Sequence, residues 1–156
     1  MLDILRQLFT NDVLWLSVVT SSLAQFLKPF TYWKRTGEFS WRHLAETGGM
    51  PSSHTAMVSA LATGVGIEQG FGSATFAISV VLAVIVMYDA ANVRREAGTH
   101  ARIINLMIAE LLEGHPIEET RLREVLGHTY REVIGGVAFG MAVMLLWKFG
   151  VQPLLL

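Results

Sequence analysis

The chain has 156 residues, of which 52% are hydrophobic and only 16% are charged, against a charged fraction of about 25% in soluble domains. This composition excludes a disordered chain and argues against an ordinary soluble domain, so we expect a small integral membrane protein with one domain, 1–156. The net charge of −1 gives no general attraction for nucleic acid, and the absence of cysteine excludes disulfides, thiolate metal sites and a cysteine nucleophile.

Four apolar segments predict an all-α bundle of about four membrane-embedded helices. They are 13–33, 53–69, 73–92 and 132–149. A bilayer core about 30 Å thick needs about 20 helical residues to cross. The segments 53–69 and 132–149 are weak as isolated spans, and their glycines suit close contact with other helices in lipid. We therefore expect both of them to pack inside the bundle.

A polar stretch, 93–131, separates the last two apolar segments. Within it, 101–112 has the apolar spacing of a helix, and Gly114 and Pro116 form a stop signal just beyond. A second short helix is expected over 118–126. We interpret these two helices as amphipathic and as lying at the membrane interface or outside the membrane.

The basic residues predict the topology. The segments 34–51 and 93–131 hold 9 of the 12 lysines and arginines. If all four apolar segments cross the membrane, these two segments lie on one side and both termini lie on the other. The positive-inside rule makes the basic side cytoplasmic.

The segment 48–56, with the sequence GGMPSSHTA, has the features of a helix start that can bind an anion. Pro51 suits the first helical position, and Ser52 and Ser53 suit the cap. Free amides at a helix start, together with serine hydroxyls, bind phosphate-like groups. His54 in the first turn would face the same anion and could donate a proton. The alternative is a plain helix cap beside a polar histidine.

His128 and Glu132 are four residues apart and so lie on one face of a helix. A carboxylate that accepts from one ring nitrogen fixes the tautomer and makes the other nitrogen a nucleophile or a base. The alternative is a surface His–Glu pair of little energetic value.

Basic side chains accompany both of these segments. Gln25, Lys28, Tyr32 and Arg35 share one face of the first apolar helix, and a lysine inside an apolar segment marks a candidate functional site. Arg94 and Arg95 follow the third apolar segment. The alternatives are snorkelling of Lys28 to the interface and simple topological anchoring by the two arginines.

The predicted topology brings these groups to one membrane face. Cations, a helix start and two histidines that converge on one place describe a phosphate site, because the cations and amides neutralise charge on phosphoryl oxygens.

The order of these motifs resembles the superfamily of type 2 phosphatidic acid phosphatases (PAP2) and vanadium haloperoxidases. The motifs are Lys-x₆-Arg, Pro-Ser-x-His, and His-x₃-acid followed by Gly-x₃-Gly. The chain is more closely similar to the divergent PAP2 membrane proteins (DUF212) over about residues 11–149. That closer likeness rests on Ala-Gln-x₂-Lys at 24–28, GGMPSSH at 48–54, Tyr-Asp-Ala at 88–90 with Val-Arg-Arg at 93–95, and Leu-Gly-His-Thr at 126–129.

The resemblance implies a role for each matching residue. His128 corresponds to the nucleophile that forms a phosphohistidine, Glu132 to the acid that orients it, and His54 to the proton donor for the leaving group. The implied phosphate ligands are Lys28, Arg35 and Ser52. We add Ser53, Arg94 and Arg95 to the predicted phosphate site because of their place at the helix start and at the end of the third apolar segment.

The sequence departs from the superfamily pattern at three of these motifs. Thr36 replaces a proline, Ser53 replaces a glycine, and Leu122 stands where the superfamily has an arginine. Arg94 is the best substitute for that arginine. A second Arg-x₅-His spacing, Arg94 to His100, lacks the following acid, because Ile104 occupies its position.

The resemblance therefore implies a membrane phosphatase that hydrolyses a phosphate ester or pyrophosphate of a lipid, with no metal and no cofactor. One alternative is a non-catalytic protein that binds a phospholipid headgroup in the same pocket. A second is a haloperoxidase that holds vanadate. The expected partners are the bilayer and a phosphorylated lipid, without nucleic acid, and the small number of spans leaves room for a homo-oligomer. We interpret His43 and His115 as solvated loop residues.

Overall fold

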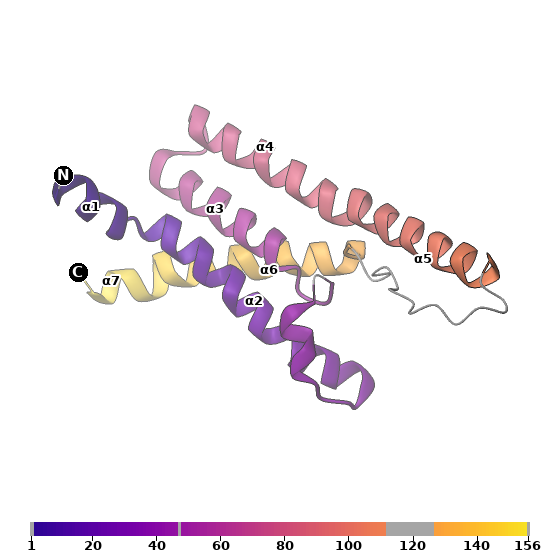
Figure 1. The fold of residues 1–156 in the computed structure, drawn as a ribbon. Helices are drawn as coiled ribbons and strands as arrows, with labels where there is room; N and C mark the ends of the chain where they lie inside the picture. The colour runs from indigo at the N-terminus through magenta and orange to yellow at the C-terminus, as the bar shows by residue number, and fades with distance from the viewer. Residues whose placement is uncertain (1, 47, 112–126, 156) are drawn as a thin grey trace.

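The computed structural model describes residues 2–46, 48–111 and 127–155, and every regular element in those ranges is helical (Figure 1). The all-α prediction is thus confirmed. In chain order the elements are α1 (Leu2–Phe9), α2 (Asp12–Thr36), the 3₁₀-helix η1 (Trp41–Ala45), α3 (Ser53–Gln69), α4 (Ala74–Tyr88), the π-helix η2 (Asp89–Val93), α5 (Arg94–Leu111), α6 (Tyr130–Leu145), the π-helix η3 (Leu146–Val151) and α7 (Gln152–Leu155).

Short polar side chains fix where the four main helices begin. Each accepts a hydrogen bond from a backbone N–H of the first turn that has no partner within the helix. The capping residues are Asn11 for α2, Ser52 for α3, Ser73 for α4 and Thr129 for α6. The predicted helix start at 51–54 is therefore confirmed.

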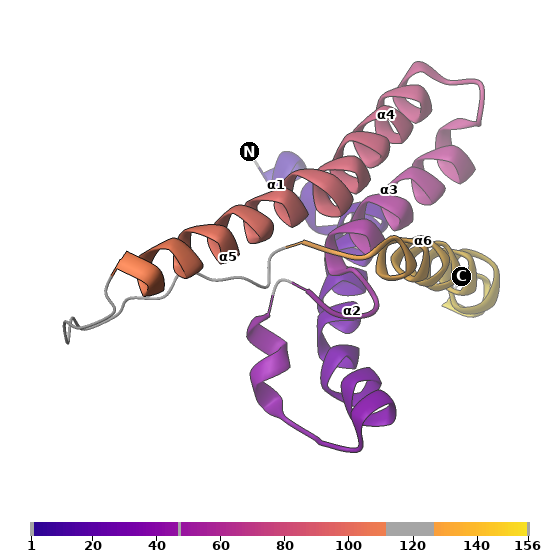
Figure 2. The same cartoon turned by 90° about the vertical axis from the view of Figure 1, so that its right-hand side faces the viewer.

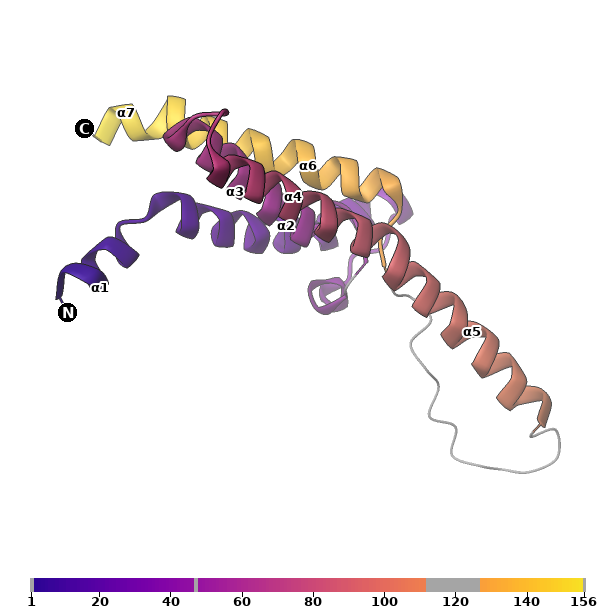
Figure 3. The same cartoon turned by 90° about the horizontal axis from the view of Figure 1, so that it is seen from above.

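Helix α3 lies at the centre of the bundle and packs against α2, α4 and α6 (Figures 1 and 3). Both chain ends and the turn between α3 and α4 lie at one end of the bundle, and the segments after α2 and before α6 lie at the other (Figure 1). This is the order of crossings that the sequence predicts. It brings the described parts of the two basic segments, 34–46 with 48–51 and 93–111 with 127–131, to the same end.

Three helical stretches within the described ranges are long and apolar enough to cross a membrane. They are Asp12–Thr36, Ala74–Ala109 and Tyr130–Leu155. Helix α3 has 17 residues, which gives a length of about 25 Å. Helix α4 exposes large apolar side chains such as Ile78, Val81 and Ile85, which are 58–67% exposed and suit contact with lipid.

Glycines bring α3 and α6 into close contact, as expected from their sequences. A Cβ atom at Gly136 would lie 2.7 Å from the carbonyl oxygen of Ser52, and one at Gly140 would overlap the main chain of Ala56. The two backbones therefore touch, and no larger residue fits at these positions without separating the helices.

The helix that begins with α4 continues further than the sequence pattern predicts. We expected the third apolar segment to end near residue 92, but α4, η2 and α5 follow one another without a break to Leu111 (Figure 3). Polar residues follow Val93, but a change in polarity does not by itself end a helix. No proline lies between Val93 and Leu111 to interrupt the helical backbone. The helix expected over 118–126 lies outside the described residues.

Three helices are joined by an ion cluster at the end of the bundle that holds the termini. Lys148 is 8% exposed, and its Nζ donates to Asp12 Oδ2 at 2.7 Å and to Glu68 Oε1 at 2.5 Å. The three residues come from η3, α2 and α3. The cluster therefore holds three helices together at the end of the bundle opposite the predicted phosphate site.

Candidate functional site

A cavity of about 810 Å³ opens at the end of the bundle that carries the basic segments. It is bounded by the last turns of α2, by η1 and the loop before α3, and by the start of α6; Figure 2 shows η1 alongside the end of α2. Its charged lining residues are Lys28, Lys34, Arg35, Glu46, Arg131 and Glu132. Its uncharged lining residues include Thr31, Tyr32, His43, Gly49, Met50 and Thr129.

His128 lies buried directly beneath one wall of this cavity. Its side chain is 2% exposed, and the cavity is lined by its neighbours Gly127 and Thr129 rather than by the ring itself. The backbone N–H of His128 donates to the carbonyl oxygen of Ala90 at 2.8 Å, which fixes the residue against η2.

Glu132 holds the ring of His128 and caps α6 at the same time. Its Oε2 atom lies 3.2 Å from His128 Nδ1 and accepts the backbone N–H of Thr129 at 3.0 Å. The Thr129 side chain accepts in turn from the Glu132 N–H, which completes a capping box. The Thr-x-x-Glu pattern that predicts this box was visible in the sequence.

The other ring nitrogen of His128, Nε2, is buried and has no hydrogen-bond partner among the described residues. A buried polar atom without a partner costs free energy, so such an atom in a well-packed place calls for an explanation. The pair that the sequence predicts is therefore formed, with Nδ1 held by Glu132 and Nε2 without a partner in the described ranges.

Ser52 and Ser53 are both buried at the start of α3. The Oγ atom of Ser52 accepts from the N–H of Thr55 at 3.4 Å and from its hydroxyl at 3.0 Å, so this side chain serves the helix cap. His54 follows in the first turn of α3; its side chain is exposed and is not among the residues that line the cavity. These three residues lie beside the site, and the structure does not bring their side chains into the cavity.

Lys28 is buried within α2, with 2% of its surface exposed, and it holds the loop that closes the cavity. Its Nζ donates to the carbonyl oxygen of Glu46 at 3.1 Å, while Gln25 Nε2 donates to the carbonyls of Leu44 and Glu46 at 2.7 and 3.1 Å. Gly49 packs against the Lys28 stem with φ of +95°, a conformation that favours glycine. Lys28 therefore lies inside the structure and is not snorkelling outward.

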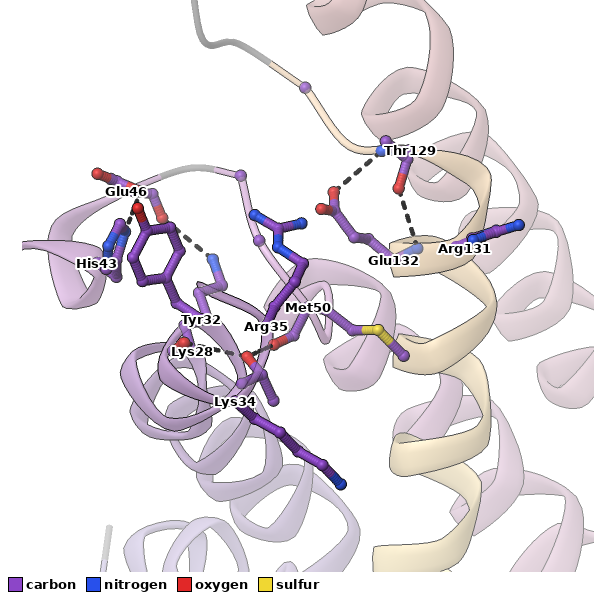
Figure 4. Close-up of a pocket in the computed structure, with 14 residues that line it drawn as sticks. Lys28, Tyr32, Lys34, Arg35, His43, Glu46, Met50, Thr129, Arg131 and Glu132 are labelled. Carbon is purple, nitrogen blue, oxygen red and sulfur yellow. Dashed lines mark hydrogen bonds and ion pairs between the residues drawn. The ribbon is translucent and has the colours of Figure 1, made fainter. Parts of the chain in front are cut away.

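Arg35 lies two turns after Lys28 on the same face of α2, as expected. Figure 4 shows its guanidinium group pointing into the space between Tyr32 and Glu132, whereas Lys34 and Arg131 point away from that space. The guanidinium carbon lies 5.8 Å from the centre of the Tyr32 ring. Lys28 and Arg35 both act electrostatically on Glu132, so the cations and the His128–Glu132 pair share one site.

His43 was wrongly interpreted as a solvated loop residue. Its side chain is 15% exposed, its ring centre lies 3.7 Å from that of Tyr32, and its Nδ1 lies 2.6 Å from Glu46 Oε2. The His-x-x-Glu spacing from 43 to 46 was the only available signal in the sequence. His115 lies outside the described residues.

The remaining predicted ligands are Arg94 and Arg95, at the start of α5. This position follows η2, whose Ala90 contacts His128, but the two arginine side chains lie outside the described part of the chain. Within the described ranges, no group of three or more histidine, aspartate or glutamate residues is arranged to hold a metal ion.

The chain is 36% identical over 154 residues to the uncharacterized membrane protein YuiD of Bacillus subtilis (strain 168), an alignment that covers 92% of this chain and 98% of that protein. No solved structure matches the chain. Residues 9–143 match the profile of the divergent PAP2 family, DUF212, so this membrane protein belongs to that family.

Proposed function

We propose that the protein is a membrane phosphatase that hydrolyses a phosphate ester or pyrophosphate of a lipid through a phosphohistidine on His128. The observation that carries the proposal is the state of the His128 ring. Glu132 holds Nδ1, and Nε2 is buried, with no partner in the part of the chain that the structure describes, beside a cavity that contains Lys28 and Arg35.

The hydrogen bond to Glu132 sets the chemistry of the ring. When the carboxylate accepts a hydrogen bond from Nδ1–H, Nε2 carries the lone pair and can attack phosphorus. The bond from phosphorus to the ester oxygen breaks, and the leaving alcohol takes a proton. Water then attacks the phosphorus while His54, now the base, takes its proton; the bond to Nε2 breaks and inorganic phosphate is released. Glu132 stabilises the positive charge that the ring gains during attack.

The cations supply the remaining stabilisation. Charge on the three peripheral phosphoryl oxygens is the main electrostatic load in phosphoryl transfer, and fixed cations in a dry site bind it best. Lys28 and Arg35 are the cations that α2 contributes to the cavity where these oxygens would lie. We assign the proton donor to His54 and a further phosphate contact to Ser52 on the family resemblance alone, and we add Ser53, Arg94 and Arg95 on their place in the sequence.

The test is phosphate release from a phosphorylated lipid by the purified chain in detergent. We expect loss of release in His128→Ala and in His54→Ala, with release retained in His100→Ala. His100 is an exposed histidine on α5 and serves as the matched control. Release that is unchanged in His128→Ala and His54→Ala would contradict the mechanism.

One set of observations favours a second function, the binding of a phospholipid headgroup without turnover. Ser52 Oγ serves the helix cap, His54 is not among the residues that line the cavity, and Leu122 replaces the superfamily arginine. Saturable binding of the lipid phosphate without any release of phosphate would establish this second function.

A further inference from the structure

One wall of the cavity belongs to no motif of the phosphatase resemblance. It consists of Tyr32 on α2 and of His43 and Glu46, which lie in and just after η1, and we call it the η1 wall. In Figure 4 these three residues lie together on the side of the cavity away from Glu132. Each of them lines the cavity.

The side chains of the η1 wall hold one another in place. The rings of His43 and Tyr32 are in contact, with their centres 3.7 Å apart and their planes tilted by 32°, and His43 Nδ1 is bonded to Glu46 Oε2 at 2.6 Å. Because Glu46 occupies Nδ1, the nitrogen of His43 that can meet a ligand is Nε2. The Tyr32 hydroxyl can both donate and accept a hydrogen bond.

The main chain beneath the wall is anchored independently of these side chains. Gln25 and Lys28 donate to the carbonyl oxygens of residues 44 and 46, and Thr31 Oγ1 donates to the carbonyl of Met50. The wall is thus preorganised, which lowers the entropic cost of binding a ligand. Side-chain substitutions in the wall leave these anchors intact.

The cavity is larger than a phosphate group alone, so a bound phosphate would leave part of it free for the rest of a ligand. Its volume of about 810 Å³ lies within the range of about 300–1,000 Å³ typical of sites for whole small molecules. Arg35 lies toward Glu132 in Figure 4, and Lys28, whose Nζ donates to the carbonyl oxygen of Glu46, lies between Arg35 and the η1 wall. The η1 wall at the other end presents hydrogen-bonding groups. The Glu46 carboxylate there is already paired with His43, so the wall suits neutral hydroxyl groups better than an ammonium group.

We propose that the η1 wall binds the hydroxyl groups of a polyol, such as glycerol, whose phosphomonoester lies against Lys28 and Arg35. This inference rests on the proposed function for the position of the phosphate. It specifies the substrate class as the phosphate of a hydroxyl-bearing alcohol. Tyr32 and His43 would be specificity-determining residues.

The test uses two phosphonates that cannot be hydrolysed and that differ only in their hydroxyl groups, dihydroxybutylphosphonate and butylphosphonate. Binding to the purified full-length chain is measured by calorimetry. We expect the dihydroxy compound to bind about tenfold more tightly, because two hydroxyl groups gain hydrogen bonds. In His43→Phe, which keeps an aromatic ring against Tyr32, and in Tyr32→Phe, that preference falls to about twofold while the affinity for butylphosphonate stays unchanged.

Lys34→Gln is the matched control, because Lys34 lines the cavity but its side chain points away in Figure 4, and it should keep the full preference. Equal affinity of the unsubstituted chain for both phosphonates would overturn the proposal. So would an equal loss of affinity for both compounds in His43→Phe and Tyr32→Phe.

Two further measurements distinguish a lipid ligand from a soluble one, and the binding proposal from the proposed catalysis. Displacement of the phosphonate at lower concentration by phosphatidylglycerol phosphate in micelles than by free glycerol 3-phosphate would support the wall as a lipid-headgroup site. The reverse order would support a wall that binds soluble polyol phosphates. If the hydroxyl preference is present but no lipid phosphate is hydrolysed, the η1 wall binds polyol hydroxyl groups as proposed and the proposed catalysis is wrong.

Discussion

The backbone N–H of Ser52 donates a hydrogen bond to the carbonyl oxygen of Glu132 at 3.1 Å. This one bond joins the two motifs that the sequence singles out, which lie 80 positions apart in the chain. It holds the start of α3 against the start of α6, and Gly136 lets the two backbones approach one turn further on. The position of the His128–Glu132 pair therefore depends on contact between these helices.

Gly140→Ala should destabilise the protein. The added Cβ would overlap the main chain of Ala56, so α3 and α6 must separate, at a cost of about 1–3 kcal/mol. Thermal unfolding in detergent measures this as a lower melting temperature. Gly72→Ala is the matched control, because nothing lies within 4 Å of its added Cβ, and its melting temperature should not change. Equal melting temperatures for the two variants would count against close helix contact.

Glu132→Gln should separate the two roles of that side chain. Glutamine still caps a helix in a capping box, so stability should change little. It cannot stabilise a positive ring on His128, so phosphate release should fall by about a hundredfold to ten-thousandfold. Thr129→Ala should do the reverse, with a loss of about 1 kcal/mol of stability and most of the activity kept. A Glu132→Gln protein with full activity would remove Glu132 from the mechanism.

Lys148→Met should destabilise the far end of the bundle without touching the cavity. It leaves Asp12 and Glu68 without their shared cation, and these carboxylates are partly exposed, so the expected loss is about 1–3 kcal/mol. The triple variant with Asp12→Asn and Glu68→Gln should recover part of the lost melting temperature. A further drop in the triple variant would show that the cluster does not act through its charges.

The absence of cysteine allows a direct test of the predicted orientation. Glu38→Cys lies in the exposed segment after α2, and Gly72→Cys lies in the exposed turn at the opposite end of the bundle. A membrane-impermeant thiol reagent should label position 38 only from the cytoplasmic side and position 72 only from the other side. The opposite pattern would reverse the predicted topology.

The fold and one half of the site could be predicted from local patterns. The helices from residues 53 and 130, the shared face of Lys28 and Arg35, and the His128–Glu132 pair all follow from helical spacing and capping residues. These features depend on neighbours within one or two turns. Sequence periodicity records such neighbours directly.

The other half of the site depends on contacts between distant segments. His43 enters the cavity because Gln25 and Lys28 bind main-chain carbonyls about 20 residues away, and a backbone carbonyl leaves no mark in the sequence. The Lys148 cluster likewise joins α2, α3 and η3. The continuation of α4 into α5 does not follow from the sequence pattern, because the change from apolar to polar residues after Val93 resembles the end of a helix.

The central claim is that His128 becomes phosphorylated during turnover. The most direct measurement is rapid quenching of the purified chain with a lipid phosphate labelled on phosphorus, followed by identification of the labelled residue. We predict an acid-labile label on Nε2 of His128, present in His100→Ala and absent in His128→Ala. Release of phosphate without any label on His128, or a label at another residue, would contradict the account.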